Sequence, residues 1–385
     1  MKKIFLMLLA ALLIVCMAAC SSNKQDGEGA DETEAAGANQ NEVELETGSF
    51  EYQLNEEGKC EIVKYTPASV KVVDIELPEK LDDRDVVGIA SSAFKAENSI
   101  KSITVPATYT YVGDYAFYDC DSLTSVTIKG DAITDIGTSA FHGCELLTSI
   151  NLPASAKTIG EFAFKDCVSL TEIDLSGVET LGDGAFIGCT DLVNVTVSDA
   201  ISKISKNAFL GCEAVEYTVE NGALYIGNAD NKYVVLVSAE NLDVDSCQVN
   251  AATKVIAEQA FLDCDLLTSV TLGASVTKIS ASCFEGCVEL EYNESENGLY
   301  LGTEENPYMV LMSTSDQSSE DFTLNTDTKI ICDQAFENYA ELQDILYAGT
   351  KEDWDAIIKA DAWHEGRTTR IVFADESIEP IIYNN

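Results

Sequence analysis

The sequence predicts an α/β repeat solenoid, in which short strands and short helical turns stack rung upon rung. Nine phenylalanines recur at steps of 23, 24, 23, 22, 23, 52, 23 and 52 residues, and a small residue directly precedes each of them. They are Phe94, Phe117, Phe141, Phe164, Phe186, Phe209, Phe261, Phe284 and Phe336. A unit of this length cannot bury its apolar face alone and must stack on its neighbours. Such an array offers an extended binding surface more readily than a catalytic pocket.

Each rung repeats the same apolar plan around its phenylalanine. An aliphatic residue lies five positions before it, as at Ile136, and a cysteine lies three positions after it in seven rungs. From the alanine onward the apolar spacing is close to three and four, which predicts one short helical turn. The residues that follow alternate, as in Leu147, Ile150 and Leu152, which predicts a short strand with one buried face. We expect all of these side chains in the core.

The repeated cysteines share one core position and are expected to be free, buried thiols. They are Cys120, Cys144, Cys167, Cys189, Cys212, Cys264 and Cys287. Of 13 cysteines, Cys16 and Cys20 fall in the leader and at its end, and the remaining eleven are an odd number, so at least one is unpaired within the chain. A disulfide between rungs about 5 Å apart is not excluded. No cysteine forms a C-x-x-C pair or neighbours a histidine, so we expect no zinc site.

The repeated phrase resembles the BspA-like subclass of bacterial leucine-rich repeats, whose consensus is I-G-x-x-A-F-x-x-C-x-x-L-x-x-I-x-[IL]-P. The best matches begin at Ile136 and Ile159. The resemblance extends from about residue 86 to residue 373. It departs at the ends, where Glu97 and Tyr339 replace the cysteine, as is common in terminal rungs. It implies a leucine-rich-repeat solenoid, and it implies adhesion or host interaction as the function.

The predicted solenoid occupies residues 86–346 and contains two insertions. The two 52-residue steps hold matching segments, in which strand-like residues flank a polar loop. Each segment is expected to be a β-hairpin, one near residues 220–240 and the other near residues 296–314. Because the apolar repeat resumes in register after each hairpin, the insertions decorate the array without ending it.

A cap is expected at each end of the solenoid. Residues 49–85 alternate in strand fashion and should close the N-terminal end. Residues 347–385 should form a helix–strand cap, because a capping box at Thr350 opens a helix there. Trp354 and Trp363 are expected to cover the core of the last rung, with a ligand platform as the alternative.

The first residues, 1–19, resemble a bacterial lipoprotein signal peptide. Lys2 and Lys3 precede an apolar run that is too short to span a membrane, and small residues lead to Cys20. The resemblance implies cleavage before Cys20 and a lipid on it, which would anchor the chain at the extracellular face of a bacterial cell membrane. An ordinary signal peptide is the alternative. Residues 20–48 carry too little apolar surface to fold, and we expect a disordered acidic tether.

Acidic residues dominate the chain and exclude several classes of function. Without Lys2 and Lys3, 21 basic residues face 66 acidic ones, a net charge of −45. Nucleic acid is therefore excluded as a partner, because it needs clustered lysine and arginine. No calcium loop is recognisable, although the acidic surface leaves calcium binding open. Neither His142 nor His364 neighbours a nucleophile in the predicted register, so we predict no enzyme, no cofactor and no metal, with a carboxylate hydrolase as a third hypothesis.

The predicted function is binding at the cell surface. We expect a monomeric lipoprotein whose solenoid binds an unidentified extracellular protein or glycan; the alternative is an envelope scaffold for another secreted protein. Positions eight and ten after each phenylalanine point away from the core on the strand side, which repeat proteins commonly use for binding. In the polar centre of this candidate binding face they are Ser149, Asn151, Glu172, Asp174, Asn194 and Thr196. The competing surface is formed by the hairpin loops at residues 227–232 and 302–307, which have tyrosines nearby.

Overall fold

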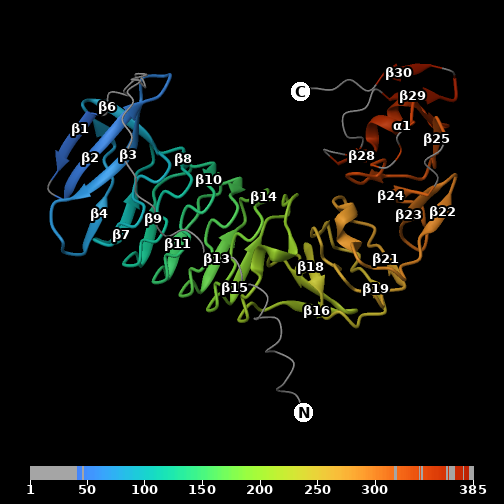
Figure 1. Cartoon of the computed structure of the whole chain (residues 1–385), viewed down its shortest axis with the longest axis horizontal. Coiled ribbons are helices and arrows are strands. Elements are labelled where there is room, and N and C mark those ends of the chain that lie inside the picture. The colour runs from blue at the N-terminus through green and yellow to red at the C-terminus, as the bar shows by residue number, and fades with distance from the viewer. Residues whose placement is uncertain are drawn as a thin grey trace, which may run out of the picture. The chain divides into compact units, whose positions relative to one another are not determined.

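The strands of the repeat region fall into two parallel series, one of short strands and one of longer strands (Figure 1). The computed structural model describes residues 41–45, 47–315, 319–337, 339, 341–360, 363, 369–375 and 377–380. The expected signal peptide, Cys20 and residues 21–40 of the expected tether lie outside the described residues. All described residues belong to one compact unit, which begins at Gln40.

The short strands each contain the aliphatic residue that lies five positions before a repeated phenylalanine. They pair in parallel and bring Val112, Ile136 and Ile159 into register. Their order is β6 (Arg84–Ile89), β8 (Tyr111–Val112), β10 (Asp135–Ile136), β12 (Thr158–Ile159) and β14 (Thr180–Leu181). A glycine follows the aliphatic residue because the rungs touch here: a Cβ on Gly160 would lie 2.5 Å from the backbone nitrogen of Thr138.

The longer strands carry the alternating end of each rung. One sheet contains, in order, β11 (Ser149–Asn151), β9 (Ser125–Ile128), β7 (Ile100–Val105) and β4 (Val73–Glu76). Two parallel pairs follow it along the chain: β13 (Glu172–Leu175) with β15 (Asn194–Val197), and β19 (Ser246–Gln248) with β21 (Ser269–Thr271). Side chains of these strands alternate between buried and exposed, as the sequence pattern predicts.

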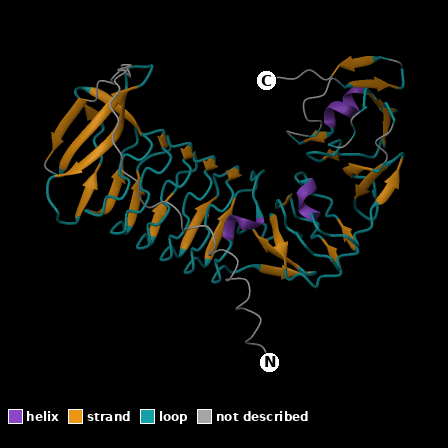
Figure 2. Ribbon diagram, viewed as in Figure 1, coloured by secondary structure: helices purple, strands orange, loops and turns teal. Residues whose placement is uncertain are grey.

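The segment around the repeated phenylalanine is a turn in seven rungs, and the predicted helical turn is present, as a 3-10 helix, only in the rungs of Phe209 and Phe284. Among the described residues, helix is confined to α1 (Lys351–Ala356) and two 3-10 helices, Lys206–Phe209 and Ala281–Phe284 (Figure 2). The α/β description is therefore not confirmed, because the solenoid is built of strands and turns.

Hydrogen bonds between rungs explain this difference. The N–H groups of Tyr115, Phe117 and Asp119 all donate to carbonyl oxygens of the next rung, 2.7–2.8 Å away. Alternate residues can point their N–H groups the same way because Tyr115 and Asp119 adopt left-handed backbone angles, with φ of 56° and 55°. The bonds between rungs thus take the place of the bonds within a helix. The two 3-10 helices occur in the rungs of Phe209 and Phe284, which directly precede the insertions.

The phenylalanine and cysteine side chains form two of the columns in the core. The rings from Phe94 to Phe209 stack at centroid spacings of 4.9–5.5 Å, with interplanar angles of 2–19°. The Sγ atoms of Cys120, Cys144 and Cys167 each donate to the phenylalanine carbonyl of the preceding rung at 3.1 Å. A small, weakly donating side chain suits this position. All eleven cysteines in the described part are free thiols, as predicted.

Both predicted hairpins are present, each with one further strand. The first insertion is an antiparallel meander of β16 (Thr218–Glu220), β17 (Ala223–Ile226) and β18 (Val235–Ala239). The second consists of β22 (Asn293–Ser295), β23 (Gly298–Leu301) and β24 (Val310–Thr314). β18 and β24 then pair in parallel with β20 (Val255–Ile256) and β26 (Ile330–Ile331). The insertions therefore end as members of the short-strand series.

The N-terminal cap begins earlier than predicted. β1 (Asn41–Leu45), β2 (Gly48–Leu54) and β3 (Cys60–Pro67) form an antiparallel meander, and β3 pairs in parallel with β6, which also pairs with β5 (Lys80–Leu81). The expectation of a tether is wrong for residues 41–45, because β2 satisfies their backbone and Val43 packs against the core. The ring of Tyr65 stacks on Phe94 at 5.5 Å, so the aromatic column starts in the cap.

The described part of the C-terminal region contains the predicted helix and closing strand. Thr350 and Asp353 form the capping box that opens α1. Trp363 lies 6.1 Å from Phe336 and 5.9 Å from Trp354, and both tryptophans are buried, so they cover the last rung and present no ligand platform. The remaining strands are β25 (Asp321–Leu324), β27 (Asp344–Tyr347), β28 (Ile358–Lys359), β29 (Arg370–Phe373) and β30 (Ile378–Pro380).

Candidate binding surfaces

The six residues of the predicted binding face lie on β11, β13 and β15. Between them the side chains of Ile150 and Ile173 are buried, so the six point away from the core. Five of the six are exposed, and Thr196 is half-buried. The structure pairs Glu172 with Asn194 and Asp174 with Thr196 across β13 and β15, whereas β11 pairs with β9 instead of β13. It therefore brings four of the candidates into one ladder, with Ser149 and Asn151 on a neighbouring one.

Two of the candidates already have structural roles. The Asn151 amide bridges two rungs: its Oδ1 accepts the Ile128 N–H at 2.8 Å and its Nδ2 donates to the Ile128 carbonyl at 2.9 Å. The Asp174 carboxylate accepts the Ser176 N–H at 2.9 Å, which closes the end of β13. For a ligand, the Glu172 carboxylate and the Asn194 amide are the more available groups.

The hairpin loops present less aromatic surface than their sequence suggests. Tyr225 and Tyr300 are fully buried, and each makes an edge contact with a half-buried tyrosine, Tyr233 or Tyr308. The first loop is held by Asn228, whose Oδ1 accepts two backbone N–H groups at 2.9–3.0 Å. The tyrosines therefore anchor the loops to the core.

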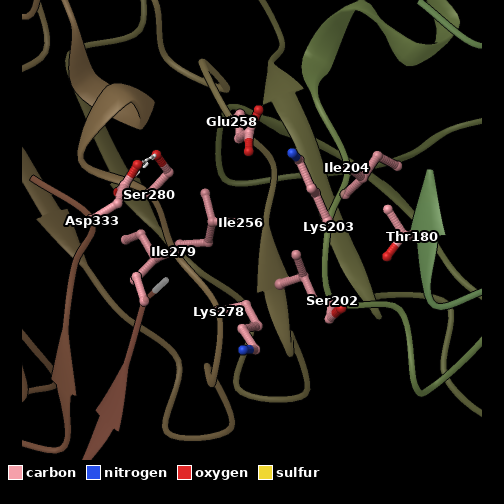
Figure 3. Close-up of a pocket in the computed structure, with 12 residues that line it drawn as sticks. Thr180, Ser202, Lys203, Ile204, Ile256, Glu258, Lys278, Ile279, Ser280 and Asp333 are labelled. Carbon is pink, nitrogen blue, oxygen red and sulfur yellow. Dashed lines mark hydrogen bonds between the residues drawn. The ribbon is translucent and has the colours of Figure 1, made fainter. Parts of the chain in front are cut away.

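A cavity of about 330 Å³ lies on the short-strand side, next to the two insertions (Figure 3). Lys203, Glu258 and Lys278 line it, and Ser280 donates to both carboxylate oxygens of Asp333 at 3.0 and 2.9 Å. Burial raises the pKa of Glu258, Asp333 and Asp183 act in the same direction, and Lys203 opposes them. In the described part of the chain, no three His, Cys, Asp or Glu side chains are placed to hold a metal ion. The cavity is best explained as a gap between rungs that the insertions hold apart.

A third surface was missed by sequence reasoning. On the turn segments of four consecutive rungs, residues two before or one after the repeated phenylalanine form an exposed or half-exposed set that we name the turn row: Lys95, Tyr115, Tyr118, His142, Phe162 and Lys165. His142 lies 4.7 Å from the Tyr118 ring, and its Nε2 is 3.5 Å from Asp166. Burial lowers the pKa of His142, with Lys165 acting in the same direction. The only sequence signal was an aromatic residue two positions before the repeated phenylalanine, at Tyr115 and Phe162, where the other rungs have serine, glycine, asparagine or glutamine. His364 lies outside the described residues.

No helix in the portion of the chain that the structure describes is long and apolar enough to cross a membrane. Burial raises the pKa of the Cys247 and Cys283 thiols to about 12, so these two thiols are poor nucleophiles.

The chain is similar to several solved leucine-rich repeat proteins. A leucine rich cell surface protein from Faecalibacterium prausnitzii is 22% identical, over 82% of this chain and 97% of that chain, with a TM-score of 0.42. A leucine-rich repeat protein from Bacteroides ovatus is 21% identical, over 84% of this chain and 97% of that chain, with a TM-score of 0.42. The T. pallidum Leucine Rich Repeat protein is 22% identical, over 63% of this chain and 87% of that chain, with a TM-score of 0.34. No curated protein matches.

The family assignment rests on the repeat itself. The model of the BspA type Leucine rich repeat region, in six copies, matches residues 87–228 and 239–345, which is more than half of the chain. The matched rungs are those whose aliphatic, phenylalanine and cysteine columns form the core. The chain belongs to the BspA-type leucine-rich-repeat family.

Proposed function

We propose that this protein is an extracellular recognition lipoprotein, held at the outer face of a bacterial cell membrane through Cys20, whose solenoid binds a protein or glycan along the strand face. Membership in the leucine-rich-repeat family supports a binding role, because stacked rungs create an extended surface without an enclosed pocket.

The leader sequence supports the anchored location. Lys2 and Lys3, the short apolar run and the small residues before Cys20 fit a lipoprotein signal. A diacylglyceryl group with an N-terminal acyl chain would supply the several chains that stable anchoring requires. Changing Cys20 to Ala should therefore move the protein from the membrane pellet to the soluble fraction. A Cys20→Ala variant that stays in the pellet would rule out this anchor.

The observation that carries the binding role is the polar ladder on β13 and β15. Glu172 and Asn194 are exposed, lie in register, and make no side-chain hydrogen bond among the described residues. Their hydrogen-bonding groups face solvent on two paired parallel strands. A ligand can therefore bind without the free-energy cost of ordering the site. We place the ligand contacts here and not on the hairpin loops.

The test is a binding screen with the full mature chain carrying Cys20→Ser. Immobilised matrix proteins, mucin and a glycan array are compared with an envelope extract of the producing cell. For any ligand found, Glu172→Ala/Asn194→Ala should weaken binding at least about tenfold, as loss of a binding hot spot does. Glu145→Ala, an exposed acidic residue on a turn segment, is the control for charge.

Two other outcomes would change the assignment. Binding lost only when residues 227–232 are replaced by Gly-Ser would move the site to the hairpin loops. Binding found only in the envelope extract, and insensitive to the strand-face variant, would favour the envelope scaffold.

A further inference from the structure

We propose that the turn row is a second docking surface, and that its partner is an arginine- or lysine-bearing segment of another protein. This surface is separate from the strand face, so the inference goes beyond the proposed function. It rests on three independent observations: the backbone cost of the aromatic residues, the arrangement of their rings, and the charge of the chain.

The fold does not require aromatic residues in the turn row. Tyr115 and Phe162 adopt left-handed backbone angles, with φ of 56° and 55°. Ser139 and Gly184 take the same conformation at the equivalent positions of neighbouring rungs. A bulky residue in this conformation is a rare outlier and costs free energy. Tyr115 is also 40% exposed, so full burial of its ring in the core does not offset the free-energy cost of its backbone conformation.

The rings are arranged to receive cations. The Tyr115 and Tyr118 rings lie 5.8 Å apart, and the Lys95 Nζ lies 5.7 and 4.8 Å from their centroids. Two rungs further along the chain, the Lys165 Nζ lies 5.9 Å from the Phe162 ring. All three distances fall within the range of cation–π attraction. Lys95 is itself exposed, so a partner's arginine or lysine can replace it above the two tyrosines at little cost.

Charge decides between a cationic and an anionic partner. The turn row contains two lysines, but Asp119 and Asp166 directly follow Tyr118 and Lys165, and Asp166 lies 4.0 Å from the Lys165 Nζ. The whole chain has a net charge of −43. A field of this sign attracts a cationic segment and repels an anionic one. The rings then supply contact energy, which exposed carboxylates alone do not.

The test uses the full mature chain with Cys20→Ser, titrated with a fluorescent nona-arginine peptide and with a nona-glutamate peptide. The variant Tyr115→Ser/Tyr118→Ser removes both rings and leaves the net charge unchanged, so non-specific attraction of the arginine peptide stays the same. We expect its affinity for the arginine peptide to fall at least about fivefold. The neutral strand-face variant Ser149→Ala/Asn194→Ala should leave that affinity unchanged, which separates this surface from the one proposed above.

Lys95→Met adds a discriminating measurement. If the rings receive a partner's cation, removing Lys95 should raise the affinity for the arginine peptide by about twofold to fivefold. The proposal would be overturned in favour of an anionic partner by either of two results. One is that Lys95→Met binds the arginine peptide more weakly. The other is that the protein binds the glutamate peptide and loses this binding in Lys95→Met. The proposal would also be overturned if Tyr115→Ser/Tyr118→Ser bound the arginine peptide with unchanged affinity. Thermal melts of Tyr115→Ser should show no loss of stability, which ensures that a binding loss reflects the surface.

Discussion

The uninterrupted rungs from Phe94 to Phe209 differ from the insertion-bearing rungs between Phe209 and Phe336. In the first region the rings stack nearly parallel, and the turns from Phe94 to Phe186 donate N–H groups to the next rung. In the second region the parallel stack consists of Phe261 and Phe284 at 5.3 Å, and Phe336 meets its neighbour Phe322 at 79°. The conformation of a rung's turn therefore depends on the rung that is stacked on it.

The largest expected effect tests whether the aromatic column stabilises the uninterrupted region more. Phe164 has a ring at 5.2 Å on each side, whereas Phe284 has one parallel neighbour, at 5.3 Å. Phe164→Ala should lower the free energy of unfolding by about 3–5 kcal/mol through lost transfer energy and a cavity. Phe284→Ala should cost less, because fewer rungs depend on it. Urea unfolding of both variants gives the answer, and equal losses would contradict the nearest-neighbour account.

The next effect concerns the buried thiols of the insertion-bearing region. Burial raises the pKa of Cys247 to about 12, from an ordinary value of 9.0. Below pH 9 the thiol is protonated in both the folded and the unfolded chain, so it contributes no pH dependence to the free energy of unfolding. Between pH 9 and 12 only the unfolded chain ionises, so stability falls by up to about 1.4 kcal/mol per pH unit for each such thiol.

The variant Cys247→Ala isolates one of these thiols. Its free energy of unfolding should be lower than that of the parent at pH 8, but should fall less steeply toward pH 11, under reducing conditions. Urea titrations across this range measure both slopes. Parallel slopes would show that Cys247 ionises equally in the folded and unfolded chains.

Sequence reasoning located the rungs and the core because those depend on a pattern that each rung carries by itself. The turns depend on a neighbour. Ala185-Phe186 and Ala208-Phe209 are the same dipeptide, yet the first lies in a turn bonded to the next rung and the second in a 3-10 helix. β1 was missed for the same reason: its acidic sequence is a strand only when paired with β2.

For the candidate binding residues, the sequence predicted the side-chain orientation but not the hydrogen bonds. The alternation correctly predicted which side chains leave the core, since strand geometry alone decides that. It could not show that the Asn151 amide is bonded to Ile128 in the preceding rung. The turn row was missed because left-handed backbone at Tyr115 arises from bonds to the next rung, which no local pattern encodes.

A smaller effect should appear in hydrogen exchange. The Phe141 N–H donates to the Ala163 carbonyl of the next rung at 2.7 Å, so it opens only when two rungs separate. The turn of Phe209 is a 3-10 helix, in which the Ala208 N–H donates locally to the Ser205 carbonyl and the Lys206 N–H donates to Glu258 in the next rung. Local bonds of this kind can open singly. Peptides covering Phe209 should therefore exchange faster than peptides covering Phe141, by about an order of magnitude in protection. Mass-spectrometric exchange measures both, and faster exchange at Phe141 would reverse the comparison.

The smallest effect concerns asparagines at strand ends. Asn151 bridges to the preceding rung through two bonds, whereas Asn241, which follows β18 in the insertion-bearing region, accepts the N–H of Asp243, two residues on, at 2.9 Å. Asn151→Ala should cost about 1–2 kcal/mol, because it removes two bonds and leaves the Ile128 N–H without its partner. Asn241→Ala should cost about 0.5–1 kcal/mol, since loss of a local turn bond leaves the strand pairing intact. Thermal melts of the two variants compare them, and the reverse order would mean that local turns stabilise this solenoid more than contacts between rungs do.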